Sequence, residues 1–176
     1  VLETACQFAR RLIEEGYPEL TVAVNISGIQ LAQADFVERV IEIVQNAGIA
    51  PDHLELEITE SILIEGLDDT QARLAQLRRA GIGIAVDDFG TGYSSYYYAS
   101  ELPIDVIKID KSFIQNIVKN TNTRSLVESV VKYCISNNSK TVAEGVETKE
   151  IADICKRIGF DYLQGYYYHK PQMMKI

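Results

Sequence analysis

Polar side chains able to perform chemistry recur along this chain at the ends of short apolar segments. The segments consist almost wholly of Val, Ile, Leu and Ala, yet each one ends in ionisable or amide side chains. These side chains are Asn25 and Ser27, Glu57 and Glu60, Asp87 and Asp88, Lys108 and Asp110, Glu144 and Glu147, and Gln164. Carboxylates gathered in one place repel one another and resist joint ionisation unless a cation offsets their charge. The acids of this set therefore predict a bound metal.

The ligand atoms on offer indicate which metal this would be. The acids expected to hold it are Glu57, Asp87, Asp88 and Glu144. Because they offer only oxygen, with no Cys or His at ligand spacing, they favour Mg²⁺ or Mn²⁺ over zinc or copper. The adjacent pair Asp87 and Asp88 suits two ions, since one carboxylate can bridge while its neighbour reaches the second ion. Two such ions stand about 3.5–4 Å apart and stabilise the entering and leaving oxygens of phosphoester cleavage.

A lysine lies at the end of the next apolar segment. Lys108 could hold or polarise an attacking water, or balance developing negative charge. Two other roles stay open at this point, a salt bridge to Asp110 or Asp87 and a Schiff base with a carbonyl substrate. The surrounding acids argue against the Schiff base, because an anionic environment raises the pKa of a lysine. For the acids, the alternatives are solvated loop positions or helix caps.

Alternating strand-like and helix-like segments are expected to position these residues. Strands are predicted at residues 21–26, 54–59, 82–86, 106–109, 141–143 and 162–163. Helices are predicted at residues 1–13, 34–46, 68–80, 112–118, 124–136 and 149–158. Gly48, Gly81 and Gly159 follow helices and suit a left-handed C-terminal cap. This order predicts an α/β fold of βα units with parallel strands.

The repeat favours a TIM-like (β/α) barrel over a dinucleotide-binding sheet. No Gly-x-Gly-x-x-Gly follows the first predicted strand, as such a sheet would require. In a barrel the chemistry lies at the carboxyl ends of the strands, where the polar residues above are found. No linker, low-complexity tract or internal repeat divides the chain, so residues 1–176 are predicted to form a single domain.

Composition limits the partners and the compartment. The chain has 25 acidic and 17 basic residues, a formal net charge of −8. DNA or long RNA is therefore excluded as an expected partner, whereas a small phosphorylated ligand is compatible with bridging cations. Cys6, Cys134 and Cys155 form no Cys-x-x-Cys pair and are expected to fill core space in a reducing compartment. We expect a cytoplasmic domain, in a parent protein that a membrane segment elsewhere could anchor.

Other residues of types that often occur in functional sites have simpler interpretations. The glycine-containing loop at residues 88–95 could approach a ligand closely. The tyrosine runs at residues 96–98 and 166–168 are expected to serve helix packing and the rim of the fold rather than base stacking. His53 and His169 lie beside predicted strands with no partner at ligand spacing, and no catalytic role is expected for them.

Motifs containing the strand-end residues resemble those of the EAL domain family, in the same order and over nearly the whole chain. Asn-x-Ser is matched at residues 25–27, Glu-x-Thr-Glu at 57–60, and Asp-Asp-Phe-Gly-x-Gly-Tyr-Ser-Ser at 87–95. The later motifs are matched at residues 102–105, 108–110, 144–147 and 164–171. The resemblance implies metal-dependent hydrolysis of cyclic di-GMP to linear pGpG in bacterial second-messenger signalling.

The resemblance also implies which residues would bind metal. Asn25, Glu57 and Asp87 match ligands of a first ion in the family. Asp87, Asp88 and Glu144 match the side of a second ion, and Glu144 is in addition a candidate general base.

The remaining matched residues have roles in catalysis and support. Lys108 matches the lysine that contacts the nucleophilic water. Gln164 matches a glutamine near that water and the substrate, and Glu147 matches a supporting glutamate counted with the catalytic set. Glu60 matches a glutamate that steadies the Asp-Phe-Gly loop. The implied partners are cyclic di-GMP, a second copy in a homodimer, and sensor or GGDEF-type domains in the parent chain.

The sequence departs from the family pattern at its start. Complete domains begin with two further strands and a helix, and the second strand carries the Glu-Ala-Leu whose glutamate binds the first ion. No Glu-Ala-Leu occurs in this sequence, and its first helical stripe has no preceding cap. We therefore expect an incomplete barrel lacking the first two strands, with little or no activity as an isolated chain. A cyclic di-GMP receptor without hydrolysis and a lysine-dependent barrel lyase are the alternative functions.

Overall fold

The computed structural model describes residues 1–64, 67–90 and 103–172, without the side chains of residues 63–68. The chain divides into two compact units. Of the described residues, 1–64, 67–85 and 103–104 belong to the first unit, and 86–90 and 105–172 belong to the second. The single domain predicted over residues 1–176 stays a prediction.

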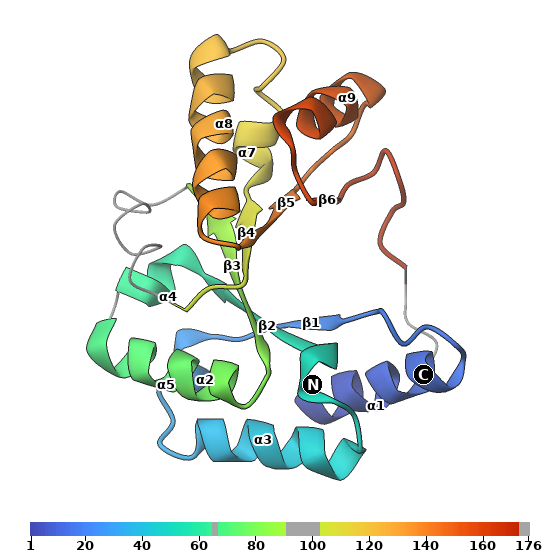
Figure 1. The fold of residues 1–176 in the computed structure, drawn as a ribbon, viewed down its shortest axis with the longest axis vertical. Coiled ribbons are helices and arrows are strands. Elements are labelled where there is room, and N and C mark those ends of the chain that lie inside the picture. The colour runs from blue at the N-terminus through green and yellow to red at the C-terminus, as the bar shows by residue number, and fades with distance from the viewer. Residues whose placement is uncertain (65–66, 91–102, 173–176) are drawn as a thin grey trace. The chain divides into compact units, whose positions relative to one another are not determined.

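The first unit begins with a helix and a strand and continues through further helices to the start of the third strand (Figure 1). Its elements are α1 (Leu2–Glu14), β1 (Val22–Asn25), α2 (Gly28–Leu31), α3 (Phe36–Ala47), the 3-10 helix η1 (Pro51–His53), β2 (Leu54–Thr59), α4 (Glu60–Ile64) and α5 (Leu67–Arg79). In the ribbon α1 lies beside α3, and it also packs against β1.

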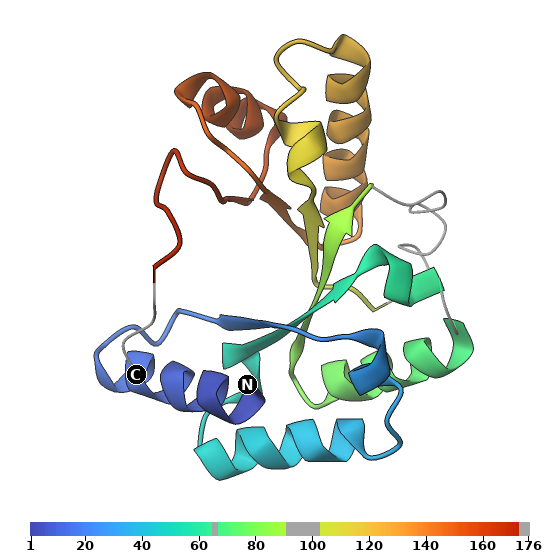
Figure 2. The ribbon, with the colours of Figure 1, turned by 180° about the vertical axis from the view of Figure 1, so that it is seen from behind.

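The second unit contains the remaining strands, as the view from behind shows (Figure 2). The strand β3 (Gly83–Phe89) runs from the first unit into the second. The other elements are β4 (Val106–Ile109), α7 (Lys111–Ile114), α8 (Thr121–Ser136), β5 (Lys140–Ala143), α9 (Lys149–Ile158) and β6 (Tyr162–Leu163). The helix α8 packs against α7 and β5.

The strands follow sequence order across a six-stranded sheet, β1-β2-β3-β4-β5-β6. The pairs β1–β2, β4–β5 and β5–β6 are parallel. Sequential parallel strands connected through helices are the pattern of a (β/α) barrel. The predicted α/β fold, an incomplete TIM-like barrel, is confirmed.

Apolar side chains explain why these segments pack as they do. In the first unit, Leu54, Leu56 and Val40 are at most 1% exposed, so β2 and α3 contribute directly to the core. In the second unit, α8 buries one face, which includes Val127 and Val131. Each such side chain removed from water stabilises the fold by about 1.5–3 kcal/mol. The strands are therefore fixed firmly enough to hold the polar residues at their ends.

Several predicted boundaries of strands and helices were wrong, and three short helices were missed. The strand β3 extends to Phe89, so Asp87 and Asp88 belong to the strand rather than to a following loop. The helix α7 ends at Ile114 instead of residue 118. The sequence reading missed α2, η1 and α4, because helices of three to five residues are too short to show a helical periodicity.

The cysteines are buried and free, in agreement with their predicted role as core residues. Burial raises the pKa of the Cys134 and Cys155 thiols to about 12. Thiols with such pKa values are protonated at neutral pH and unreactive. Among the helices that the structure describes, none has the length and apolar character needed to cross a membrane.

Candidate functional site

The carboxyl ends of three strands in the second unit bring together a lysine and two acids. Lys108 lies in β4, Asp87 in β3, and Glu144 directly follows β5. The Lys108 Nζ is 2.9 Å from Glu144 Oε1 and 3.1 Å from Asp87 Oδ1. Because β4 is buried along its whole length, burying the Lys108 ammonium is costly, and these two ion pairs offset that cost. The predicted salt bridge to Asp87 is thus present, with Glu144 as a further partner.

Asp88 adds a third carboxylate to this group. Its φ of 55° is left-handed, a conformation that Asp tolerates better than most side chains. Its backbone N–H donates to Asp87 Oδ1 at 3.0 Å. Each of three residues contributes one carboxylate oxygen to a group whose members lie within 4.8 Å of one another; the residues are Asp87, Asp88 and Glu144. We call these three residues the acidic cluster.

The electrostatics of the acidic cluster are unbalanced. Asp88 is an exposed residue whose carboxylate is partly desolvated, and this desolvation, followed by the nearby charges of Asp87 and Asp110, raises its pKa. The positive charges of Lys108 and Lys111 act in the opposite direction but do not cancel these effects. A group of close carboxylate oxygens whose negative charges repel one another fits a hard divalent cation. The residues present thus suit the predicted second ion.

The first unit holds the other predicted metal ligands as a pair. Asn25 and Glu57 occupy the same register position at the carboxyl ends of β1 and β2. The Asn25 Nδ2 donates to Glu57 Oε2 at 3.0 Å, and Glu57 is only 8% exposed. The prediction that these two residues share an ion with Asp87 stays a prediction, because Asp87 belongs to the second unit.

Glu60 is the first residue of α4 and is 3% exposed. The role expected for Glu60 is to steady the Asp-Phe-Gly loop. Residues 91–95 of that loop lie outside the described residues, and so does the tyrosine run at residues 96–98. At the described end of that loop, Gly90 has a φ of 104°, and a Cβ there would lie 2.9 Å from Cε2 of Phe113. A side chain at position 90 would therefore disturb both the backbone and α7. The role of Glu60 stays a prediction.

Glu147 and Gln164 belong to two segments that are hydrogen-bonded to each other. The Val146 N–H donates to the Gln164 carbonyl at 3.0 Å, and the Gln164 N–H donates to the Ala143 carbonyl at 2.9 Å. A Cβ at Gly165 would overlap the backbone of Val146. This glycine is therefore required for the close approach of the two segments.

Gln115, which follows α7, is a residue that sequence reasoning missed. Its Nε2 donates to Glu147 Oε1 at 3.0 Å. No sequence pattern could have revealed it, because an exposed glutamine after a helix looks like any solvated surface residue. The structure thus gives the supporting glutamate a partner of its own.

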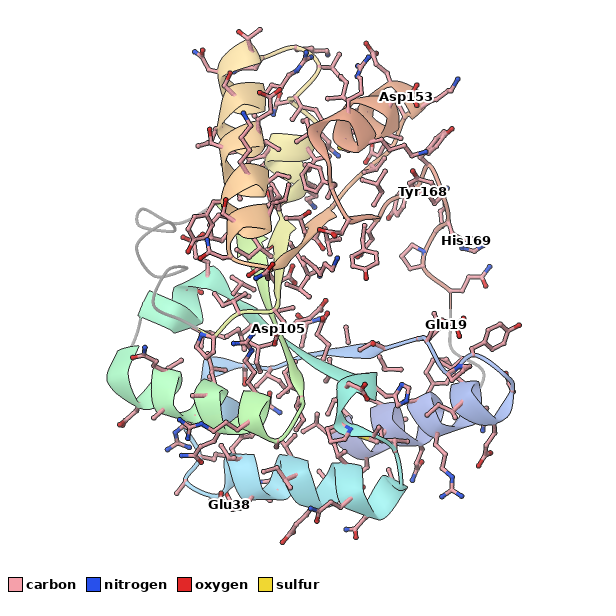
Figure 3. The ribbon with its side chains drawn as sticks, viewed as in Figure 1. Glu19, Glu38, Asp105, Asp153, Tyr168 and His169 are labelled. Carbon is pink, nitrogen blue, oxygen red and sulfur yellow. The ribbon has the colours of Figure 1, made fainter. Side chains whose placement is uncertain are left out.

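The residues expected to lie outside the site have local contacts. The His53 Nδ1 lies 3.2 Å from the Leu20 carbonyl oxygen, in the first unit. Tyr168 and His169 lie on the segment after β6 (Figure 3), where Tyr168 is 47% exposed. The rings of Tyr167 and Tyr168 pack edge to face with centroids 5.1 Å apart. The sequence suggested strand and rim aromatics at residues 166–168; these tyrosines are exposed, but they form a turn after β6 rather than part of a strand.

Comparisons with known proteins agree with the motif order. The EAL domain matches residues 1–171 of this chain. The bifunctional diguanylate cyclase/cyclic di-GMP phosphodiesterase MucR of Pseudomonas aeruginosa is 37% identical over 171 residues, which are 97% of this chain and 25% of that protein. The chain thus spans about a quarter of the length of this curated relative.

Solved structures give the same result. The PaMucR phosphodiesterase in complex with cyclic di-GMP matches with a TM-score of 0.91 and 37% identity, over 97% of this chain and 69% of that one. The manganese/cyclic di-GMP complex of Klebsiella pneumoniae BlrP1 matches with a TM-score of 0.86 and 29% identity, over 97% of this chain and 44% of that one. Strand order, strand-end residues and these matches all agree, and the chain belongs to the EAL domain family.

Proposed function

We propose that this chain is part of a phosphodiesterase domain that hydrolyses one phosphodiester bond of cyclic di-GMP to give linear pGpG. The observation that carries the proposal is the placement of Lys108 against Asp87 and Glu144. These residues lie at the carboxyl ends of strands, where barrel enzymes perform their chemistry. Relatives in the family bear the name cyclic di-GMP phosphodiesterase.

The proposed reaction needs an activated water. The Glu144 carboxylate accepts a proton from this water, whose oxygen then forms the new bond to phosphorus as the bond to the ribose oxygen breaks. The leaving ribose oxygen takes up a proton from solvent water and becomes a hydroxyl, and Glu144 later returns its proton to the solvent. The Lys108 ammonium donates to the water or to the charge developing on the phosphate. A charged group held in a buried position acts strongly there, because little water screens it.

Divalent metal ions complete the proposal. We assign Mg²⁺ or Mn²⁺, two ions, with Asn25, Glu57 and Asp87 for the first and the acidic cluster for the second. When bound, such ions neutralise the phosphate and lower the pKa of coordinated water. The BlrP1 structure, described as a manganese/cyclic di-GMP complex, supports manganese.

The remaining residues have supporting roles in this proposal. Gln164 contacts the substrate near the water, and Glu147 supports the catalytic set with Gln115 as its hydrogen-bond donor. Glu60 steadies the loop that follows β3. We further propose a cytoplasmic domain that forms a homodimer and works beside sensor or GGDEF-type domains. The bifunctional name of MucR, and its greater length, support such additional domains.

The experiment is the conversion of cyclic di-GMP by the longest natural chain that carries these residues. Chromatography would follow substrate and pGpG with Mn²⁺ present, for the parent and for Asp87→Asn. Lys140→Met is a suitable control, because Lys140 pairs with Asp161 rather than with the acidic cluster. We expect pGpG from the parent and the control alone. Tight binding of cyclic di-GMP without any product would support the receptor function instead.

A further inference from the structure

Lys108 is a buried cation inside an otherwise apolar strand. Its neighbours Ile107 and Ile109 are 1% and 2% exposed, and Lys108 itself is 6% exposed. Burying an ammonium group is unfavourable unless it is paired with opposite charge. Lys108 meets this requirement through Glu144 Oε1 and Asp87 Oδ1, at 2.9 and 3.1 Å.

The carboxylates that hold the ammonium also belong to the acidic cluster. Asp87 and Glu144 are two of the three residues whose oxygens lie within 4.8 Å of one another. An oxygen that accepts from an ammonium group and an oxygen that coordinates a metal offer the same negative charge and lone pairs. Two cations drawn to the same oxygens also repel each other. The ammonium and a metal ion are therefore rivals at this position.

We propose that Lys108 is a built-in counter-cation that competes with the divalent ion for Asp87 and Glu144, and so sets the metal affinity of the acidic cluster. The inference rests on the proposed function. A metal ion entering the acidic cluster weakens at least one of the two ion pairs. The ammonium then becomes available to the water or the phosphate, so that metal loading prepares Lys108 for its catalytic role.

A simple alternative predicts the opposite sign. If Lys108 served only to align the carboxylates, its removal would let Asp87 and Glu144 separate, and metal binding would weaken. If Lys108 competes, its removal leaves the same acids with more unneutralised charge, and metal binding strengthens. The direction of the change in affinity therefore distinguishes the two roles.

The test is calorimetric titration of the chain with Mn²⁺ in the absence of substrate. Lys108→Met removes the charge while keeping a long side chain, and we expect Mn²⁺ to bind about tenfold more tightly, a change worth about 1.4 kcal/mol. Lys108→Arg keeps the charge and should stay near the parent. Lys140→Met removes a lysine of the same unit whose Nζ pairs with Asp161 at 2.8 Å, and it should leave the affinity unchanged.

Thermal unfolding with and without Mn²⁺ gives a second measurement. A ligand that binds only the folded state raises Tm, and at a given concentration a tighter ligand raises it further. Lys108→Met should show a larger Mn²⁺-induced rise in Tm than the parent, even if its metal-free Tm is lower. Failure of both Lys108→Met and Lys108→Gln to fold at saturating Mn²⁺ would overturn the inference in favour of alignment.

The remaining outcomes separate this inference from the proposed function. Mn²⁺ binding by the parent, with equal or weaker binding by Lys108→Met, would overturn the competition alone. An absence of Mn²⁺ binding in both proteins would overturn the competition together with the proposed metal dependence. Binding that is detectable only in Lys108→Met would be the strongest support.

Discussion

The two ends of the strands in the second unit use similar charged groups in opposite ways. At the amino end, one carboxylate, Asp161, accepts from Lys140 Nζ at 2.8 Å and from the Thr141 N–H and hydroxyl at 2.9 and 3.1 Å. At the carboxyl end, one ammonium group, Lys108, lies between two carboxylates, and Asp88 stands close to both. The first arrangement is rich in donors, and the second is rich in negative charge.

The pKa values of the acids follow this difference. Burial alone would raise the pKa of Asp161, but the hydrogen bonds from Lys140 and Thr141 outweigh burial and lower it. At the other end, burial and neighbouring carboxylates together raise the pKa of Asp88. A carboxylate surrounded by donors stabilises a fold, whereas carboxylates that raise one another's pKa are typical of functional sites. The comparison therefore indicates a structural amino end and a functional carboxyl end.

Lys108→Ala should produce the largest effect of the substitutions considered. In the complete domain we expect kcat for cyclic di-GMP to fall by roughly 10²–10³-fold, the usual cost of removing a donor that stabilises charge developing in the transition state. The Kd for cyclic di-GMP should change little, because the group acts mainly in the transition state. Steady-state kinetics and equilibrium binding would measure the two quantities. Equal losses of binding and turnover would instead identify Lys108 as a substrate clamp.

Asp161→Asn should affect stability and spare catalysis. Losing charge-assisted hydrogen bonds at a partly buried site should lower the free energy of unfolding at pH 7 by about 1–3 kcal/mol. Because the folded-state pKa of Asp161 is lowered, its contribution is present above the unfolded pKa and disappears as the pH falls through the folded pKa. Urea unfolding of parent and variant should therefore converge in acid. A loss of turnover per folded molecule would contradict the assignment of the amino end to structure.

Asp88→Asn should have the opposite effect on metal-free stability. The folded-state pKa of Asp88 is raised above 3.8, so the parent is most favoured below that pH and loses stability as Asp88 ionises. Removing the charge should stabilise the metal-free protein at pH 7 by only a few tenths of a kcal/mol, since Asp88 is exposed and screened by solvent. Denaturant unfolding of parent and variant in the presence of a metal chelator would measure this gain in the free energy of unfolding. A loss of stability at pH 7 would show that the ionised carboxylate has a structural role.

Gln115→Met should give the smallest change in turnover. Removing one hydrogen bond to Glu147 should lower kcat by about two- to tenfold, in line with the usual contribution of a hydrogen bond. Asn116→Met is the matched control, because the Asn116 Nδ2 donates to the Ser112 carbonyl. If both variants were equally impaired, the contact between Gln115 and Glu147 would have no particular role in turnover.

The carboxyl end was largely predictable from sequence, and the amino end was not. Parallel strands in sequence order bring their carboxyl ends together, so the positions of Asp87, Lys108 and Glu144 along the chain were enough to predict that they gather at one edge of the sheet. The ion pair between Lys108 and Glu144 was not predicted. Asp161 and Thr141 carry no such signal, since an acid before a short strand resembles a solvated loop residue. Their hydrogen bonds join residues 20 positions apart and depend on the register of β5 and β6.

The arrangement of the predicted metal ligands was also only partly predictable from the sequence. The Asn25–Glu57 pair follows from the parallel register of β1 and β2, which places the two residues side by side. The left-handed backbone of Asp88 could not be predicted, because the sequence pattern does not report φ for a residue other than glycine. The role of Gln115 was equally hidden, since its partner Glu147 is 32 residues away.

The most direct test of the account is the rate of pGpG formation from cyclic di-GMP by the complete domain as the Mn²⁺ concentration is varied. The account predicts no product in the presence of a strong chelator, recovery when Mn²⁺ is restored, and no recovery for Asp87→Asn. Hydrolysis that persists in the chelator, or that is unchanged in Asp87→Asn, would contradict a metal-dependent site built on these strand ends.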